Sequence, residues 1–302
     1  MIQLRDYQRA AIDALWDYFR SGAGGNPIVA CPTGAGKSVI QAVFLEEALT
    51  QFPTTRVLCA THVGELVQQN AMGIRKNWPQ VPMGIYAAGL GQRNLGQQVT
   101  VASIQSIYKR AAALGKVDLL MIDEAQLISR KGEGMYRKLI DALMETNPMM
   151  KVIGLTATPY RMDSGSLIDP EEGTIFTDLC YDIELGFLVE QGYLSPLQSK
   201  KPTAVFDLSD LKPKTRGDWT ESDLSEVVDT DKNNGPAVAE MYQLAHDRKK
   251  WLVFAVNVAH AHNLNRLISA GGRKSRVIEG SMDKATRAQY IAMYQRGELD
   301  CL

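Results

Sequence analysis

The sequence has no long hydrophobic run and few cysteines. No apolar stretch approaches the roughly 20 residues of a membrane-spanning helix, and the first residues, MIQLRDYQRA, lack the apolar core of a signal peptide. The four cysteines, Cys31, Cys59, Cys180 and Cys301, are far apart and form no CxxC pair, which disfavours a zinc site. We therefore expect a cytoplasmic protein with reduced thiols and no membrane partner.

An excess of either charge is also absent. The net charge is −1, so no global basic field attracts nucleic acid, and such a partner would have to be held by a local surface. The HAH stretch at His260–His262 resembles a metal ligand pair, but residues two apart on a helix point to different faces, so we expect no metal there. The chain has 302 residues, of which 45% are hydrophobic and 22% charged, as expected for a globular protein of two domains.

Five short apolar runs occur in the first half of the chain. They are too continuous for half-exposed strands and are typical of buried parallel strands. Helical patterns lie between some of them, which predicts βαβ units and an α/β fold with a parallel sheet. The runs are PIVAC (27–31), RVLCAT (56–61), QVTVAS (98–103), DLLMID (118–123) and KVIGLT (151–156). Each ends in polar or small residues, and the carboxyl ends of such strands form the ligand-binding edge of an open sheet.

The first run ends in CPTGAGKS, which has the Gly-Lys-Ser core of a phosphate-binding loop between a strand and a helix. Gly34 and Gly36 allow backbone N–H groups to surround phosphate oxygens, and the helix beginning near Lys37 adds its positive end. Lys37 is expected to reach the β- and γ-phosphates and Ser38 to bind magnesium. Cys31 replaces the usual first glycine. The alternative is an ordinary glycine-rich turn, which explains less of the pattern.

The fourth run ends in two adjacent acids, within MIDEAQLIS. Burying carboxylates is costly unless cations meet them. We expect Asp123 to end a strand neighbouring the phosphate loop and to hold the magnesium, directly or through water. Glu124 is expected to orient or deprotonate the attacking water. Two acids at a helix N-terminus are a plausible alternative for either residue alone, but not for both together with GAGKS.

These motifs, in this order, resemble those of superfamily-2 helicases of the DEAD/DEAH-box kind, in particular phage and restriction-type DNA helicases. LRDYQRAAI is similar to the adenine-reading segment, CPTGAGKS to motif I, ATHVGEL to motif Ia, VASIQS to motif Ib, DEAQ to motif II and TATP to motif III. The resemblance implies a RecA-like fold, ATP and Mg²⁺ as cofactors, and nucleic acid as partner.

The resemblance also implies roles for individual residues. The nucleotide-binding residues are Arg5, Gln8, Pro32, Thr33, Gly34, Ala35, Gly36, Lys37 and Ser38. The catalytic residues are Lys37, Asp123, Glu124 and Gln126, and the metal ligands are Ser38 and Asp123. The loops at Thr61, His62, Ser103 and Gln105 are expected to contact nucleic-acid phosphates, which positions a strand without reading bases. Thr156 and Thr158 are expected to couple the two ligand sites.

Two features depart from the family pattern. Gln126 stands where the family has Asp or His; it can still donate and accept hydrogen bonds, and so bridge to Thr156 or to the second domain. The chain also stops at ELDCL, where the family continues with motifs V and VI and an arginine finger. A finger contributes roughly 10³ to 10⁵ to the rate, so we expect this chain to bind ATP and Mg²⁺ but to turn over slowly, with little nucleic-acid stimulation.

The domain boundaries are less clearly marked. We expect a first RecA-like domain over 1–195, including a turn-rich linker from about 162, and the start of a second over 196–302. In the second part, WLVFAV from Trp251 and RVIEG from Arg276 are predicted strands, and Ser281 is the predicted cap of a helix through about Arg296. The polar stretch 207–236 is predicted to be a solvated linker. Its basic cluster of Lys212, Lys214 and Arg216 near Trp219 is a possible nucleic-acid contact.

The leading functional hypothesis is ATP-driven movement on, or remodelling of, nucleic acid. DNA is favoured over RNA because RDYQ and TATPYR resemble duplex-DNA translocases and restriction-type helicases. A second hypothesis is a nucleotide-gated nucleic-acid-binding module with little hydrolysis. A third, a small-molecule kinase, fits poorly with the motif order after DEAQ.

Overall fold

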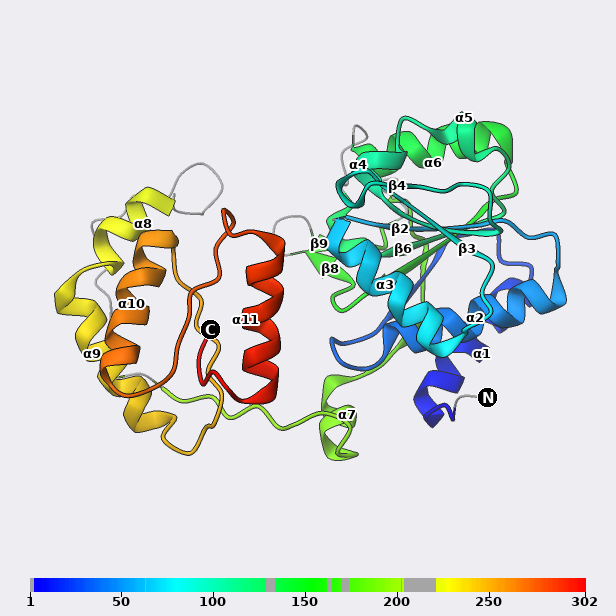
Figure 1. The fold of residues 1–302 in the computed structure, drawn as a ribbon. Helices are drawn as coiled ribbons and strands as arrows, with labels where there is room; N and C mark the ends of the chain where they lie inside the picture. The colour runs from blue at the N-terminus through cyan, green and yellow to red at the C-terminus, as the bar shows by residue number, and fades with distance from the viewer. Residues whose placement is uncertain are drawn as a thin grey trace. The chain divides into compact units, whose positions relative to one another are not determined.

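The chain forms two compact units, Met1–Pro196 and Leu197–Leu302, which we call unit 1 and unit 2. The computed structural model describes residues 3–62, 64–128, 134–161, 165–169, 174–201, 203 and 221–302 (Figure 1). Among these residues, no helix is both long and apolar enough to cross a membrane. The predicted basic cluster at 212–216 and Trp219 lie outside the described residues.

Unit 1 is built around an eight-stranded sheet of order β10-β1-β7-β6-β2-β5-β3-β4. All pairings in it are parallel except that of β4 with β3. The strands are β1 (Pro27–Ala30), β2 (Val57–Thr61), β3 (Met83–Ala87), β4 (Gln92–Arg93), β5 (Val99–Ser103), β6 (Leu119–Asp123), β7 (Lys151–Thr156) and β10 (Asp178–Asp182). The five predicted strands are all present, whereas β3, β4 and β10 were not predicted.

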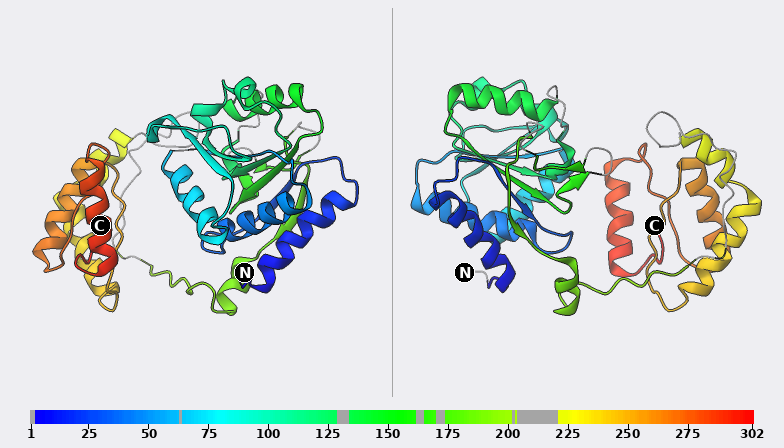
Figure 2. Two further views of the ribbon diagram at one scale, coloured as in Figure 1. Left: turned by 45° about the vertical axis from the view of Figure 1, so that its right-hand side comes forward. Right: turned by 180° about the vertical axis from the view of Figure 1, so that it is seen from behind.

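Helices cover both faces of this sheet (Figures 1 and 2). They are α1 (Asp6–Arg20), α2 (Lys37–Gln51), α3 (Gly64–Asn77), α4 (Ile104–Ile107), α5 (Ala111–Leu114), α6 (Met135–Thr146) and α7 (Leu185–Glu190), with short 3₁₀ turns at Ala88–Leu90 (η1) and Ala125–Leu127 (η2). The small hairpin of β8 (Tyr160–Arg161) and β9 (Gly165–Ser166) follows β7.

Two hydrophobic clusters fix these layers. Successive residues of each central strand point to opposite faces, so Leu119 and Met121 of β6 pack with α1, α2 and α3, whereas Leu120 and Ile122 pack with α4, α5 and α6. Both faces of the sheet are therefore buried from solvent, and for this reason the strand sequences are continuously apolar rather than alternating. This burial confirms the predicted α/β class and leaves the polar strand ends at one edge.

Unit 2 contains the helices α8 (Glu221–Val228), α9 (Asp231–Leu244), α10 (Val258–Ala270) and α11 (Lys284–Arg296). The prediction of a solvated linker is wrong for 221–236, because α8 and the first part of α9 occupy these residues. Asp229 stabilises this polar stretch by accepting hydrogen bonds from Asn234 and Asn263. The predicted cap at Ser281 is also wrong: the carboxylate of Asp283 accepts from the Thr286 N–H at 2.9 Å.

The two predicted strands of unit 2 are wrong as continuous strands. Trp251 and Ser275 each form only an isolated bridge, both to Cys301. Extended backbone at 300–302 supplies the hydrogen bonds, since Trp251 N–H donates to the Asp300 carbonyl and Val253 N–H to the Leu302 carbonyl. The run WLVFAV is also partly exposed to solvent, since Phe254 is 87% exposed.

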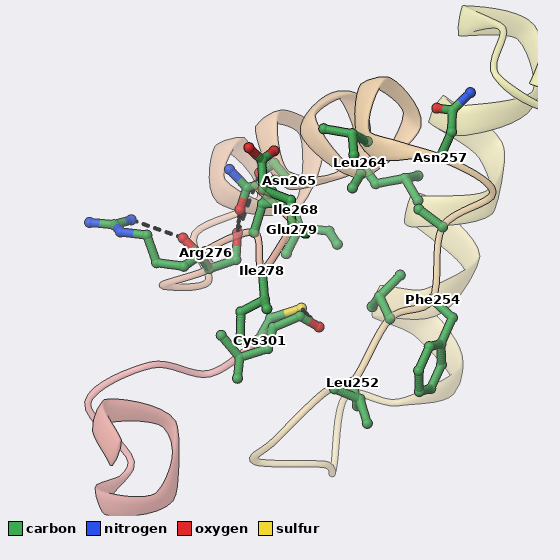
Figure 3. A pocket seen from close by; sticks show the side chains of 18 of the residues that line it. Leu252, Phe254, Asn257, Leu264, Asn265, Ile268, Arg276, Ile278, Glu279 and Cys301 are labelled. Atoms are coloured by element: carbon green, nitrogen blue, oxygen red, sulfur yellow. Dashed lines mark hydrogen bonds between the residues drawn. The ribbon is translucent and has the colours of Figure 1, made fainter. Parts of the chain in front are cut away.

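A cavity of about 580 Å³ lies beside these segments in unit 2 (Figure 3). Its lining is mainly apolar and includes Leu264 and Ile268 of α10, Leu252, Phe254 and Cys301. Asn265 and Ser275 hydrogen-bond each other on its wall. All the residues that line the cavity belong to unit 2.

Candidate nucleotide site

The phosphate loop lies between β1 and α2, as its sequence predicts. Gly34 and Gly36 have φ values of +86° and +91°, a region that side chains disfavour. An alanine at Gly36 would be strained by this φ, and its Cβ, 2.6 Å from Nε2 of Gln8, would also displace the Gln8 side chain. Lys37 and Ser38 open α2, whose positive end therefore faces the loop. This geometry suits an anion held by backbone N–H groups.

The first turn of α1, which follows the N-cap residue Arg5, is hydrogen-bonded to this loop. Nε2 of Gln8 donates to the carbonyl of Ala35 at 3.1 Å, and the hydroxyl of Tyr7 donates to the same carbonyl at 2.9 Å. The Arg5 N–H donates to Oε1 of Gln8 at 3.1 Å, and the Arg5 guanidinium donates to the Tyr7 hydroxyl. Arg5 and Gln8 thus lie beside the loop, as expected. Tyr7 was not predicted, although its position between them in RDYQ was a usable signal.

The acidic pair lies at the carboxyl end of β6 and meets Lys37. The Lys37 Nζ atom is 2.8 Å from Oε1 of Glu124 and 3.7 Å from Oδ1 of Asp123. The expected cationic partner of the carboxylates is therefore in place. The expectation that β6 directly neighbours the loop strand is wrong, because β7 lies between β1 and β6. The Lys37 side chain nevertheless reaches both acids at the end of β6.

Glu124 has an unusual backbone and a perturbed side chain. Its φ is +56°, and it is the one non-glycine residue with positive φ in the described part of the chain. Such a conformation costs on the order of 1–3 kcal/mol, and it clusters at functional sites. Burial opposes ionisation, but hydrogen bonds from Gln126 and Lys37 outweigh it and lower the pKa of Glu124. The carboxylate is therefore ionised at neutral pH, as a proton acceptor must be.

Gln126 joins this acid to the end of β7. Its Nε2 donates to Oε2 of Glu124 at 2.7 Å, and its Oε1 accepts from the Thr156 hydroxyl at 2.5 Å. The Thr156 hydroxyl in turn accepts from the Thr158 N–H at 3.0 Å. The predicted bridge from Gln126 to Thr156 is confirmed. The result is a continuous polar path from DEAQ to TATP.

Two further side chains at the acidic pair were not predicted. Nδ2 of Asn70, on α3, donates to Oδ2 of Asp123 at 2.9 Å and so fixes that carboxylate. The hydroxyl of Tyr136, on α6, is buried without a hydrogen-bond partner. Burial raises the pKa of Tyr136, and the carboxylates of Asp123 and Glu124 raise it further. Neither residue lies in a recognisable motif, so only the packing of α3 and α6 places them here.

The predicted nucleic-acid loops follow β2 and β5, which lie next to each other with Thr61 paired to Ser103. Gln105 is exposed, whereas Thr61 and Ser103 are only 1% and 4% exposed. The Ser103 hydroxyl donates to that of Ser106 at 2.8 Å. The Thr61 hydroxyl and Nδ1 of His62 are buried without a partner. Of the four side chains, only Gln105 is thus fully presented to a ligand.

The residues present fit a magnesium nucleotide. In the described residues, no group of three or more His, Cys, Asp or Glu side chains forms a self-sufficient metal site. Mg²⁺ in phosphate-loop proteins does not need one, since it takes one or two protein oxygens together with phosphate oxygens and water. Ser38 and Asp123 supply such oxygens. Gly73 of α3 packs closely on Ser38, since a Cβ built on Gly73 would lie 2.8 Å from the Cβ of Ser38.

Comparison with known proteins places this architecture in a family. The model of the family described as "Type III restriction enzyme, res subunit" matches residues 1–161, more than half of the chain. The chain belongs to this family. Membership agrees with the resemblance to superfamily-2 helicases of the restriction type that the motifs show.

Two curated relatives match over almost the whole chain. A putative ATP-dependent helicase, IRC3, of Saccharomyces cerevisiae is 26% identical over 99% of this chain and 44% of its own length. A DNA 3'-5' helicase, XPB, of Mycobacterium tuberculosis is 25% identical over 99% of this chain and 51% of its own length. The chain thus spans about half the length of these relatives.

Solved structures share the fold. The Hef helicase domain of Pyrococcus furiosus has a TM-score of 0.57 at 16% identity, covering 100% of this chain and 86% of that one. The type ISP restriction-modification enzyme LlaBIII bound to DNA has a TM-score of 0.62 at 11% identity, covering 98% of this chain and 23% of that one. These similarities confirm the RecA-like fold.

Proposed function

We propose that this chain is the motor of an ATP-dependent DNA helicase or translocase. The observation that carries the proposal is the cluster at the sheet edge, in which Lys37 pairs with Glu124 and Gln126 connects Glu124 to Thr156. Unit 1 is the first RecA-like domain in this proposal, and unit 2 belongs to the second. The names of the relatives, which include a DNA 3'-5' helicase, favour DNA over RNA.

In this proposal each residue of the cluster has a distinct task. Ser38 and Asp123 would hold Mg²⁺, which when bound would supply positive charge to neutralise the transferred phosphoryl group. Asn70 keeps the Asp123 carboxylate oriented. Lys37 exchanges its ion pair with Glu124 for the phosphates, and this exchange frees Glu124 to accept the proton of the attacking water.

The path through Gln126 and Thr156 then links the nucleotide site to the end of β7. A change at Glu124 alters the hydrogen bond that Gln126 can donate, and therefore the one that Thr156 donates to Gln126. Through this path, Thr156 and Thr158 of TATP change their hydrogen bonds when the nucleotide site changes. Two domains that close on ATP and reopen after hydrolysis can convert this signal into movement along DNA.

The test is ATP hydrolysis under single-turnover conditions, which measures slow reactions, with no nucleic acid, duplex DNA or duplex RNA. Because these 302 residues include no segment resembling motif VI, which carries the arginine finger, the proposal predicts slow hydrolysis that DNA accelerates only slightly, but more than RNA does. Lys37→Ala, which removes the phosphate contact, is the control for contaminating ATPases. The proposal is wrong if the wild-type chain hydrolyses ATP no faster than Lys37→Ala, and its choice of DNA is wrong if RNA is the better activator.

A further inference from the structure

Arg5 is stacked on an aromatic ring from a distant part of unit 1. Its guanidinium carbon lies 4.3 Å from the centroid of the Tyr193 ring, a cation–π distance. Its Nη1 also donates to the Tyr7 hydroxyl at 3.1 Å, which fixes it from a second direction. Arg5 is nevertheless exposed. An exposed planar guanidinium with one face on a ring keeps its other face available for a second flat group.

The segment that carries Tyr193 is held against the nucleotide site. Gly192, with φ of +69°, follows the end of α7, and the N–H groups of Tyr193 and Leu194 both donate to the Leu188 carbonyl. The Tyr193 ring lies 5.4 Å from that of Tyr7, whose hydroxyl holds the phosphate loop at Ala35. A Cβ on Gly34 would lie 2.8 Å from Cδ2 of Leu194, so the same segment also contacts the loop.

We propose that Tyr193 is a positioning residue for the nucleotide base, which acts through Arg5. Its ring holds the Arg5 guanidinium flat, so that the opposite face of Arg5 stacks on adenine while Gln8 contacts the edge of the base. This inference rests on the ATP site proposed above. In this proposal Tyr193 acts through Arg5, which stacks on the base, so the loss of the ring should be felt in the binding of the base.

The experiment compares the binding of ATP with that of inorganic tripolyphosphate, both with Mg²⁺, by calorimetry. Tyr193→Leu keeps an apolar side chain but removes the ring. We expect it to weaken ATP about tenfold, equivalent to about 1.4 kcal/mol, and to leave tripolyphosphate binding unchanged. Tyr193→Phe, which keeps the ring, should retain the affinity for ATP. Arg5→Lys, which keeps the charge but loses the flat surface, should reproduce the loss.

Phe187 supplies the matched control. Its ring also packs against Tyr7, at 6.2 Å, and it belongs to α7 in the same segment, but it is the Tyr193 ring that stacks on Arg5. Phe187→Leu should therefore bind ATP as the wild type does. An equal loss in Phe187→Leu, an equal loss for tripolyphosphate, or an unchanged ATP affinity in Tyr193→Leu would overturn the proposal. If the wild-type chain hydrolyses ATP in response to DNA while Tyr193→Leu binds ATP normally, only this inference fails.

Discussion

Replacing Gln126 with leucine tests the polar path between the two motifs. The substitution keeps the size of the side chain but removes the bond to the Glu124 carboxylate at 2.7 Å and the bond from Thr156 at 2.5 Å. A hydrogen bond to a charged group contributes about 1.5–3 kcal/mol and a neutral one about 0.5–1.5 kcal/mol. Because Gln126 is only half-buried, water replaces part of both, and we expect a loss of about 2 kcal/mol in the free energy of unfolding.

Urea unfolding of unit 1 at several pH values measures this loss. The hydrogen bond from Gln126 lowers the pKa of Glu124 in the folded chain. Its contribution is therefore fully present above the ordinary pKa of 4.5 and fades as the pH falls through the lower folded value. The difference between wild type and variant should accordingly shrink in acid. Gln69→Leu, at an exposed position of α3, is the matched control. Equal stabilities at neutral pH, or a difference that grows in acid, would refute the reasoning.

Two substitutions and one labelling experiment test further single features of unit 1. Gln8→Ala should weaken ATP more than GTP, because the Gln8 amide keeps one N–H and one lone pair for the edge of adenine; equal losses in nucleotide titrations would contradict this role. Tyr136→Phe removes a buried hydroxyl that has no partner, so it should raise the free energy of unfolding by up to about 1 kcal/mol in urea; a destabilised variant would show that the hydroxyl is paired in solution. Burial raises the pKa of the Cys31 and Cys59 thiols to about 12, so a disulfide reagent at pH 8 should label them only after denaturation; fast labelling of the folded chain would show that this part of the sheet opens.

The sequence was sufficient where local pattern and tertiary structure agree. The buried strands of unit 1 were predictable because both of their faces are covered, which makes each run continuously apolar. β3 escaped prediction because Gly84 interrupts it; a Cβ there would lie 2.6 Å from the Asn94 carbonyl, so glycine is required by the return of the chain. β10 is a half-exposed edge strand with acids at both ends, Asp178 and Asp182, which hides its pattern.

Unit 2 shows the opposite case. WLVFAV has the composition of a strand, but a strand also needs partners, and Trp251 and Val253 find theirs only at 300–302. The polar residues of 221–236 resemble a linker locally, yet most of them are helical. Asp229, between α8 and α9, accepts hydrogen bonds from Asn234 and from Asn263 of α10. In the nucleotide site, sequence motifs identified Lys37 and the two acids. Asn70 and Tyr136 reach the site because α3 and α6 pack there, and no local sequence pattern predicts that packing.

The most direct test of the central claim compares binding and hydrolysis in Glu124→Gln. The account predicts that this variant binds Mg²⁺–ATP as tightly as the wild type but hydrolyses it about 10²–10⁴ times more slowly in a single turnover, because it lacks the general base. Lys37→Ala should instead lose ATP binding itself. Hydrolysis at the wild-type rate in Glu124→Gln, or normal ATP binding in Lys37→Ala, would contradict the assignment of this cluster as the ATP-hydrolysing site.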